Sequence, residues 1–169
     1  RLGAADGVAI VCRPGFTVRG GFGRRVFSAT SQEIENLVAS HVELLRDVAR
    51  NEGTAITHVK PHGAMYNVAV NDAIHSKNIC EAILEINPNL ILVALTGSSW
   101  VDIATEMGVR VAREAFIDRA VNSDGSLVSR SIEGAVLHDV DKIVERTLSI
   151  VNDGFVNSIS GEEVQIKAD

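Results

Sequence analysis

Short apolar runs alternate with longer segments of helical periodicity along the chain. The apolar runs predict strands at Val8–Cys12, Ile56–Lys60, Leu90–Leu95, Val109–Phe116 and Val164–Ala168. Apolar residues that recur every three or four positions predict helices at residues 30–53, Asn71–Glu85, Trp100–Met107 and Val140–Asn152. Because apolar strands joined by helices are typical of a parallel sheet that is covered on both faces, the pattern predicts an α/β fold.

The first long helix has the clearest boundary signals. Thr30 and Glu33 have the spacing of a capping box, and Gly53 provides a C-terminal stop. The apolar stripe between them consists of Ile34, Leu37, Val38, Val42, Leu45, Val48 and Ala49. Two loops interrupt the pattern, a Gly- and Arg-rich one at Arg13–Ala29 and a polar one at Ile117–His138. No linker, repeat or low-complexity segment stands out, so residues 1–169 are predicted to form a single domain.

The two ends of the pattern look incomplete. Arg1–Gly7 resembles the last turn of a helix, and no helix follows the run at Val164–Ala168. A barrel made of the predicted strands alone would keep exposed edges, which folded proteins avoid. We therefore expect the chain to be part of a larger fold.

Composition and charge narrow the class of protein. Of the 169 residues, 46% are hydrophobic and 22% are charged, which is typical of a folded domain. A net charge of −6, with one Trp and one Tyr, argues against nucleic acid or an anionic membrane as a partner. Cys12 and Cys80 have no motif spacing and are expected to be reduced and partly buried. Since no apolar run reaches the roughly 18 residues of a membrane span, a cytoplasmic location is predicted.

The richest candidate chemistry lies in the run His58–Asn67, straight after the second predicted strand. Strand alternation puts His58 and Lys60 on one face, Pro61 ends the strand, and Gly63 permits a sharp turn. His58, Lys60 and His62 are therefore expected to converge at the carboxyl end of this strand, where parallel α/β proteins bind substrates. The alternative is ordinary polar capping of a strand end.

Two further segments carry weaker signals. Glu114 and Asp118, four residues apart on one face of a strand end, could hold Mg²⁺ or pair with Arg119. The alternative is an Asp118–Arg119 salt bridge that pins the long loop. Gly20–Gly23 does not continue into a Walker motif, so a flexible turn that displays two arginines, Arg24 and Arg25, is the preferred interpretation. The alternative is direct contact of its backbone amides with a nucleotide phosphate. His41 lies on the apolar stripe and is expected to be a satisfied core imidazole.

Several segments together resemble the LamB/YcsF family. They are Pro14–Phe16, Gly21–Arg25, His58–Asn67 and Glu114–Arg119, followed in the same order and spacing by Asp124–Arg130, Gly134–Asp139 and Glu163–Lys167. The resemblance implies a β/α barrel of the glycoside hydrolase/deacetylase type, seven-stranded in the family and here incomplete at both ends. The family's acidic opening strand and its closing Val-His-Gly-Asp strand have no counterpart here. Arg13 stands where the family normally has a histidine before Pro-Gly-Phe.

The resemblance also implies an activity: ATP-dependent opening of the 5-oxoproline lactam to glutamate, together with two partner subunits, B and C. ATP is then a co-substrate, with Mg²⁺. The roles implied for this chain are catalytic for His62, Lys60 and Asp118, and substrate- or phosphate-binding for His58, Gly63, Tyr66, Asn67, Arg24, Arg25, Glu114 and Arg119. His62 is the expected acid–base group, because the unperturbed pKa of histidine lies near neutrality.

Two rival hypotheses stay open. One is a metal-dependent amidase or carbohydrate deacetylase, with His58, His62 and Asp118 as candidate ligands. The other is a non-catalytic scaffold that binds partner subunits or a dicarboxylate-like ligand. Whether the protein uses a metal, and whether it forms a homo-oligomer, are not fixed by the sequence.

Overall fold

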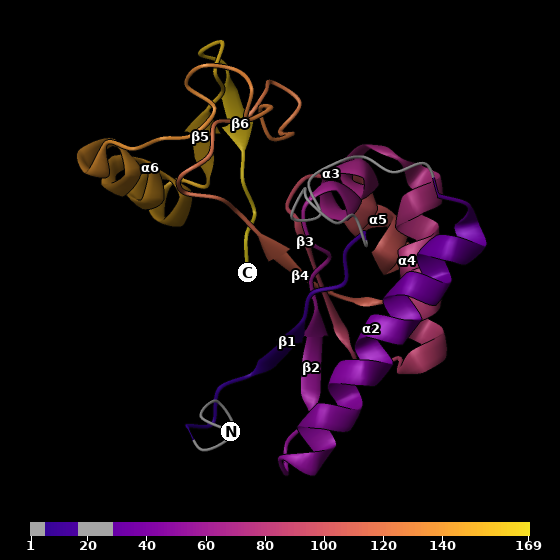
Figure 1. Ribbon diagram of the computed structural model, residues 1–169. Coiled ribbons are helices and arrows are strands. Elements are labelled where there is room, and N and C mark those ends of the chain that lie inside the picture. The colour runs from indigo at the N-terminus through magenta and orange to yellow at the C-terminus, as the bar shows by residue number, and fades with distance from the viewer. Residues whose placement is uncertain (1–5, 17–28) are drawn as a thin grey trace. The chain divides into compact units, whose positions relative to one another are not determined.

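The computed structural model describes residues 6–16 and 29–169, which form two compact units (Figure 1). Of the described residues, 6–16, 29–94 and 99–112 form the N-terminal unit, and Leu95–Ser98 and Arg113–Asp169 form the C-terminal unit. The interpretation of residues 1–169 as a single domain stays a prediction.

A four-stranded sheet organises the chain. Its strands follow the order β1-β2-β3-β4 and are β1 (Ile10–Cys12), β2 (Ile56–Val59), β3 (Ile91–Leu95) and β4 (Arg110–Glu114). β1 pairs with β2 in parallel, with Cys12 opposite Val59, and β2 pairs with β3 in parallel, with Val59 opposite Leu92. The predicted α/β class is confirmed. Within the described residues this sheet is open rather than closed into a barrel.

Helices of the N-terminal unit pack on one another and on the strands. They are α2 (Ser31–Asn51), α3 (Ala64–Asn71), α4 (Ala73–Ile86) and α5 (Ser99–Glu106). α2 packs against α4 and contacts β1 and β2, while α4 also contacts α3 and α5. Trp100 of α5 is fully buried in this unit, and so are Val38 and Val42 of α2 and Val59 of β2. Ile34, Val38, Val42 and Ala49 of the predicted apolar stripe are buried, whereas Val48 is 52% exposed.

The start and end of α2 confirm the sequence signals. Thr30 accepts a hydrogen bond from the Glu33 backbone N–H, and the Glu33 carboxylate accepts one from the Thr30 backbone N–H at 2.8 Å, which completes the capping box. Gly53 follows the helix with a φ of +71°, a conformation that favours glycine.

The helix predicted at Asn71–Glu85 is wrong in its start. The predicted residues belong to α4, which begins at Ala73 after its N-cap Asp72, while Asn71 is the last residue of α3. The Asp72 carboxylate accepts hydrogen bonds from the backbone N–H groups of Ile74 at 2.9 Å and His75 at 3.0 Å. An aspartate in this position starts a new helix, so the chain changes direction between two adjacent helical segments.

The C-terminal unit differs most from the prediction. It contains α6 (Val140–Asn152) and a two-stranded antiparallel sheet of β5 (Phe155–Asn157) and β6 (Glu163–Gln165). The run at Val164–Ala168 is therefore not a further parallel strand. β5 was missed because its apolar run is short and directly follows a turn at Gly154 (φ +72°). A small core of Val121, Val156, Val164 and Ile166 holds this unit together.

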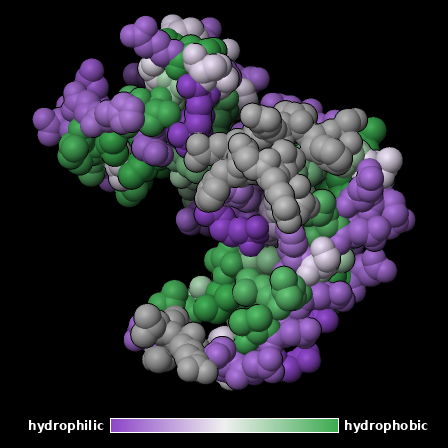
Figure 2. Space-filling model, viewed as in Figure 1, coloured by the Kyte–Doolittle hydropathy of each residue, from purple (hydrophilic) through white to green (hydrophobic). Residues whose placement is uncertain are grey.

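One face of α6 is apolar and exposed, and it forms part of the hydrophobic surface in Figure 2. It carries Val140, Val144, Leu148 and Val151. None of the described helices is long and apolar enough to cross a membrane.

Candidate functional site

The loops that follow β1 and β2 run side by side. Because Cys12 lies opposite Val59, the next residues of the two strands also face each other. The backbone N–H of Lys60 donates to the carbonyl of Cys12 at 2.8 Å, and the N–H of His62 donates to the carbonyl of Pro14 at 2.7 Å. The parallel ladder thus continues past both strands and fixes His62 against the segment after β1.

Arg13 and His62 are in direct contact at this strand end. Nη2 of Arg13 lies 3.1 Å from Nδ1 of His62. A guanidinium can only donate hydrogen bonds, so Nδ1 of His62 accepts. Sequence reasoning noted Arg13 as a departure from the family pattern, but missed that it meets His62.

Gly15 completes the surroundings of His62. A Cβ added to Gly15 would lie 3.3 Å from Cβ of His62, which is tighter than an ordinary side-chain contact. The backbone N–H of Gly15 in turn donates a long hydrogen bond, 3.4 Å, to Nδ1 of His41 on α2. This contact agrees with the expectation that His41 is a satisfied imidazole. The equal offset of Gly15 and His62 from the ends of β1 and β2 could have predicted their contact.

His58 lies on β2 and is half-buried. Its Nδ1 lies 2.7 Å from the hydroxyl oxygen of Thr57, which also lies 3.3 Å from the carbonyl of Ile10 on β1. His58 is therefore linked to the β1 strand through Thr57, whereas His62 is held by Arg13 beyond the strand ends. In the sequence, Lys60 lies between the two histidines. It is half-buried and is the first residue beyond β2.

The residues after His62 form α3, an element that the sequence analysis did not predict. Gly63 is its N-cap with a φ of 60° and a ψ of −123°, a conformation that requires glycine. The Asn67 side chain is exposed, and its backbone N–H donates to the Gly63 carbonyl at 3.1 Å. Tyr66 is only 4% exposed and packs edge-on against Trp100, with ring centroids 5.5 Å apart. The geometry favours a core role for Tyr66 over the predicted substrate contact.

Glu114, Asp118 and Arg119 lie in the C-terminal unit. Glu114 ends β4, but Asp118 lies in an exposed turn beyond the strand, so the two do not share a strand face as predicted. Arg119 is 6% exposed, and its guanidinium donates to the carbonyls of Ala135 at 3.2 Å and Val128 at 2.6 Å. Burial lowers the pKa of this guanidinium below its usual value. Arg119 thus holds the long loop together, which favours a structural role over the predicted phosphate contact.

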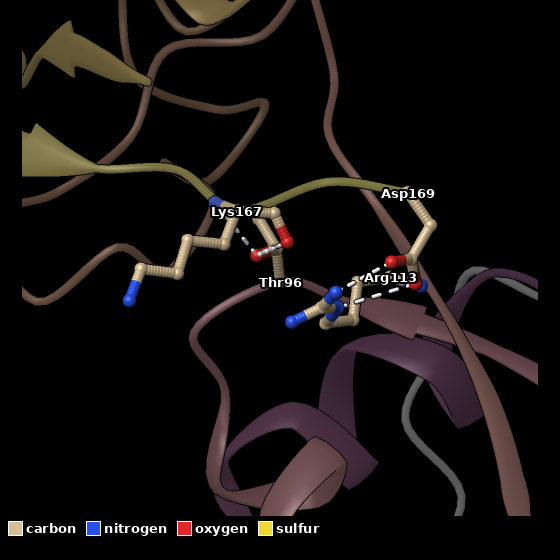
Figure 3. Close-up of polar contacts among 4 residues, drawn as sticks. All are labelled: Thr96, Arg113, Lys167 and Asp169. Atoms are coloured by element: carbon tan, nitrogen blue, oxygen red, sulfur yellow. Dashed lines mark hydrogen bonds and ion pairs between the residues drawn. The ribbon is translucent and has the colours of Figure 1, made fainter. Parts of the chain in front are cut away.

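A polar cluster that the sequence did not reveal fastens the last described residues within the same unit (Figure 3). The Thr96 hydroxyl donates to the Lys167 carbonyl at 2.8 Å and accepts from the Lys167 N–H at 3.2 Å. Arg113 donates hydrogen bonds to the Asp169 carboxylate from its guanidinium and from its backbone N–H, the latter at 2.8 Å. These hydrogen bonds, led by the side chain of Arg113, hold the pKa of Asp169 down at about 2.

Two groups of predicted site residues remain, the phosphate-binding arginines and the possible metal-binding side chains. Arg24 and Arg25 lie outside the described residues, as does the turn at Gly20–Gly23. The described residues contain no group of three or more His, Cys, Asp or Glu side chains that could hold a metal ion. They therefore offer no support for the rival hydrolase with His58, His62 and Asp118 as ligands.

Comparison with known proteins identifies relatives over the whole chain. The sequence matches the LamB/YcsF family over residues 1–169. It is 47% identical to the A subunit of 5-oxoprolinase from Alkaliphilus metalliredigens, over 95% of this chain and 63% of that protein. The protein of the same name from Clostridium beijerinckii is 42% identical, over 100% of this chain and 66% of that protein.

A solved structure shares the fold. The crystal structure of the lactam utilization protein from Thermus thermophilus has a TM-score of 0.92 and 37% sequence identity, and the match covers 100% of this chain and 68% of that one. The chain spans about two thirds of the length of these relatives. With matching sequence along all 169 residues and a shared α/β fold, the chain belongs to the LamB/YcsF family.

Proposed function

We propose that this chain belongs to one component of an ATP-dependent 5-oxoprolinase, the A subunit, which takes part in opening the lactam of 5-oxo-L-proline to give L-glutamate. The observation that carries the proposal is 42–47% identity, along essentially the whole chain, to proteins that bear the name of this 5-oxoprolinase component. The name of the related crystal structure, a lactam utilization protein, points to the same class of substrate.

The strand-end geometry suits this chemistry. An amide carbonyl is a poor electrophile, so an enzyme that opens a lactam needs a donor for the oxygen as negative charge develops on it. His62, neutral with its proton on Nε2, is such a donor in our proposal. Lys60, the first residue beyond β2, brings a positive charge to the same strand end, which suits the carboxylate of the substrate or a phosphoryl group.

ATP and partner subunits complete the proposal. Coupling to ATP makes sense if the oxyanion that forms when water attacks the lactam carbonyl then accepts the γ-phosphoryl group, with release of ADP. The C–N bond breaks to leave an acyl phosphate, which a second water hydrolyses to glutamate and phosphate. Because the relatives are named as one lettered component of an assembly, we propose that two further subunits, B and C, act together with this one. We place Mg²⁺ with the nucleotide, because Mg²⁺ is usually bound through substrate phosphates together with one or two carboxylates.

The proposal is tested by measuring glutamate release from 5-oxoproline after the protein is mixed with the B and C subunits. Four samples are compared, with and without ATP and with and without the B and C subunits. Release that needs both is the expected result. A protein that folds and binds the two subunits but releases no glutamate would refute the proposal.

A further inference from the structure

We propose that Arg13 is a positioning residue for His62: it fixes the imidazole as a neutral ring that donates a hydrogen bond to substrate through Nε2. This inference deepens the proposed function and rests on it. His62 then acts as an electrophile towards the lactam carbonyl rather than as the acid–base group that the sequence first suggests.

The hydrogen bond between Arg13 and His62 can run in only one direction. Arg13 lies 3.1 Å from Nδ1 of His62, and a guanidinium has no acceptor. Protonating Nδ1 would break this bond and put two cations side by side. The contact therefore favours the neutral ring, and it fixes which nitrogen carries the proton.

The pair is also held rigidly. The Arg13–His62 contact is exposed, and a single exposed side-chain contact would position the ring weakly. Here, however, the two backbones are joined at 2.7 Å between His62 N–H and the Pro14 carbonyl, and Gly15 closes on Cβ of His62. Three consecutive residues, Arg13 to Gly15, thus restrain one histidine at its backbone, its Cβ and its ring.

The fixed ring has a chemical consequence. A neutral imidazole that is held with a fixed N–H can donate to a carbonyl oxygen as charge develops on it, and it does so without changing its own protonation state. A general acid must instead give up a proton and be recharged in each cycle. A guanidinium next to Nδ1 suits the first role and opposes the second.

The direct test observes the ring nitrogens of His62 by ¹⁵N NMR, with the His62→Asn variant used to assign them among the five histidines. In the wild-type protein we expect Nδ1 to be unprotonated and Nε2 to be protonated. Arg13→Met should move the Nδ1 signal, because the hydrogen bond is lost, whereas Arg13→Gln, which keeps an N–H donor, should move it less. Arg50→Met, which removes an arginine that is 73% exposed on α2, is the matched control and should leave it in place.

Turnover by the assembled enzyme gives the second readout. Arg13→Met should lower kcat roughly tenfold to a hundredfold, the cost of a misplaced group, with little change in KM. Arg13→Gln should recover part of that loss, and Arg50→Met should match the wild-type protein.

The outcomes separate this inference from the proposed function. A wild-type His62 with its proton on Nδ1, or an Nδ1 signal that Arg13→Met does not move, would overturn the positioning role even if turnover is normal. Full kcat in Arg13→Met would overturn it too. Absence of glutamate release from the wild-type assembly would instead refute the oxoprolinase proposal, while the NMR result would still decide how Arg13 holds His62.

Discussion

At the scale of single residues, the contact between Arg13 and His62 defines the candidate site, with Nη2 of the arginine 3.1 Å from Nδ1 of the imidazole. The run from His58 to Asn67 could be singled out from its density of polar groups after a strand. The partner of His62 could not, because Arg13 lies 49 positions away and only strand register brings the two together. The substrate contact of Tyr66 was implied by the family resemblance, and its packing against Trp100 depends on tertiary structure that the local sequence does not show.

The two cysteines provide a prediction at this scale. Burial raises the pKa of the thiols of both Cys12 and Cys80 to about 11. At pH 8 the thiolate fraction, and with it the alkylation rate, should be roughly a hundredfold below that of an ordinary cysteine. Mass spectrometry after iodoacetamide treatment should find both thiols largely unmodified in the native protein and modified in guanidinium. Equal rates in the two states would contradict the burial of these thiols.

Asp169 gives a prediction about pH. The folded-state pKa of this carboxyl, about 2, lies below the usual value of about 3.9, so the Arg113–Asp169 contact stabilises the fold above about pH 4. That contribution should be lost as the pH falls towards 2. The difference in urea midpoint between wild type and Asp169→Asn should therefore shrink over this range.

Arg113→Met serves as the partner variant for the same contact and should show the same pH dependence as Asp169→Asn. A midpoint difference that stays constant from pH 5 to pH 2 would show that the carboxylate charge plays no part.

At the scale of elements, periodicity predicted the long helix and the first strands well. The signals of α2 were redundant, since its capping box, apolar stripe and terminal glycine all agree. Prediction failed where a single residue or a run of three residues determines a helix boundary or a strand pairing. The helix α3 was not predicted, Asp72 caps α4 two residues after the predicted start, and the three-residue β5 changes the partner of the last strand. Short strands depend on tertiary pairing, which local patterns do not contain.

The capping box of α2 makes a prediction at this scale. Thr30→Ala removes the hydroxyl that accepts the Glu33 N–H, and it should cost about 1 kcal/mol in the free energy of unfolding. Thr30→Ser keeps the hydroxyl and should cost clearly less. Urea titration of both variants measures the effect. Equal stability of Thr30→Ala and wild type would mean that the box contributes nothing in this protein.

At the scale of the whole molecule, alternating strands and helices were enough for the fold class, and the motif order was enough for the family. The chain contains two compact units, and the sequence between them has no linker composition that would mark a boundary. Activity belongs to this scale as well. The relatives are longer than this chain and are named as one component of a larger enzyme, so the reaction that we propose is a property of an assembly.

The most direct test of the central claim is glutamate release from 5-oxoproline by the assembled enzyme with His62→Asn in this chain. His138→Asn, the same substitution at an exposed histidine of the C-terminal unit, is the control. We expect the control to match the wild-type rate and His62→Asn to lose roughly a hundredfold or more in kcat, with unchanged circular dichroism and unchanged binding of the B and C subunits. Wild-type turnover in His62→Asn would contradict the account.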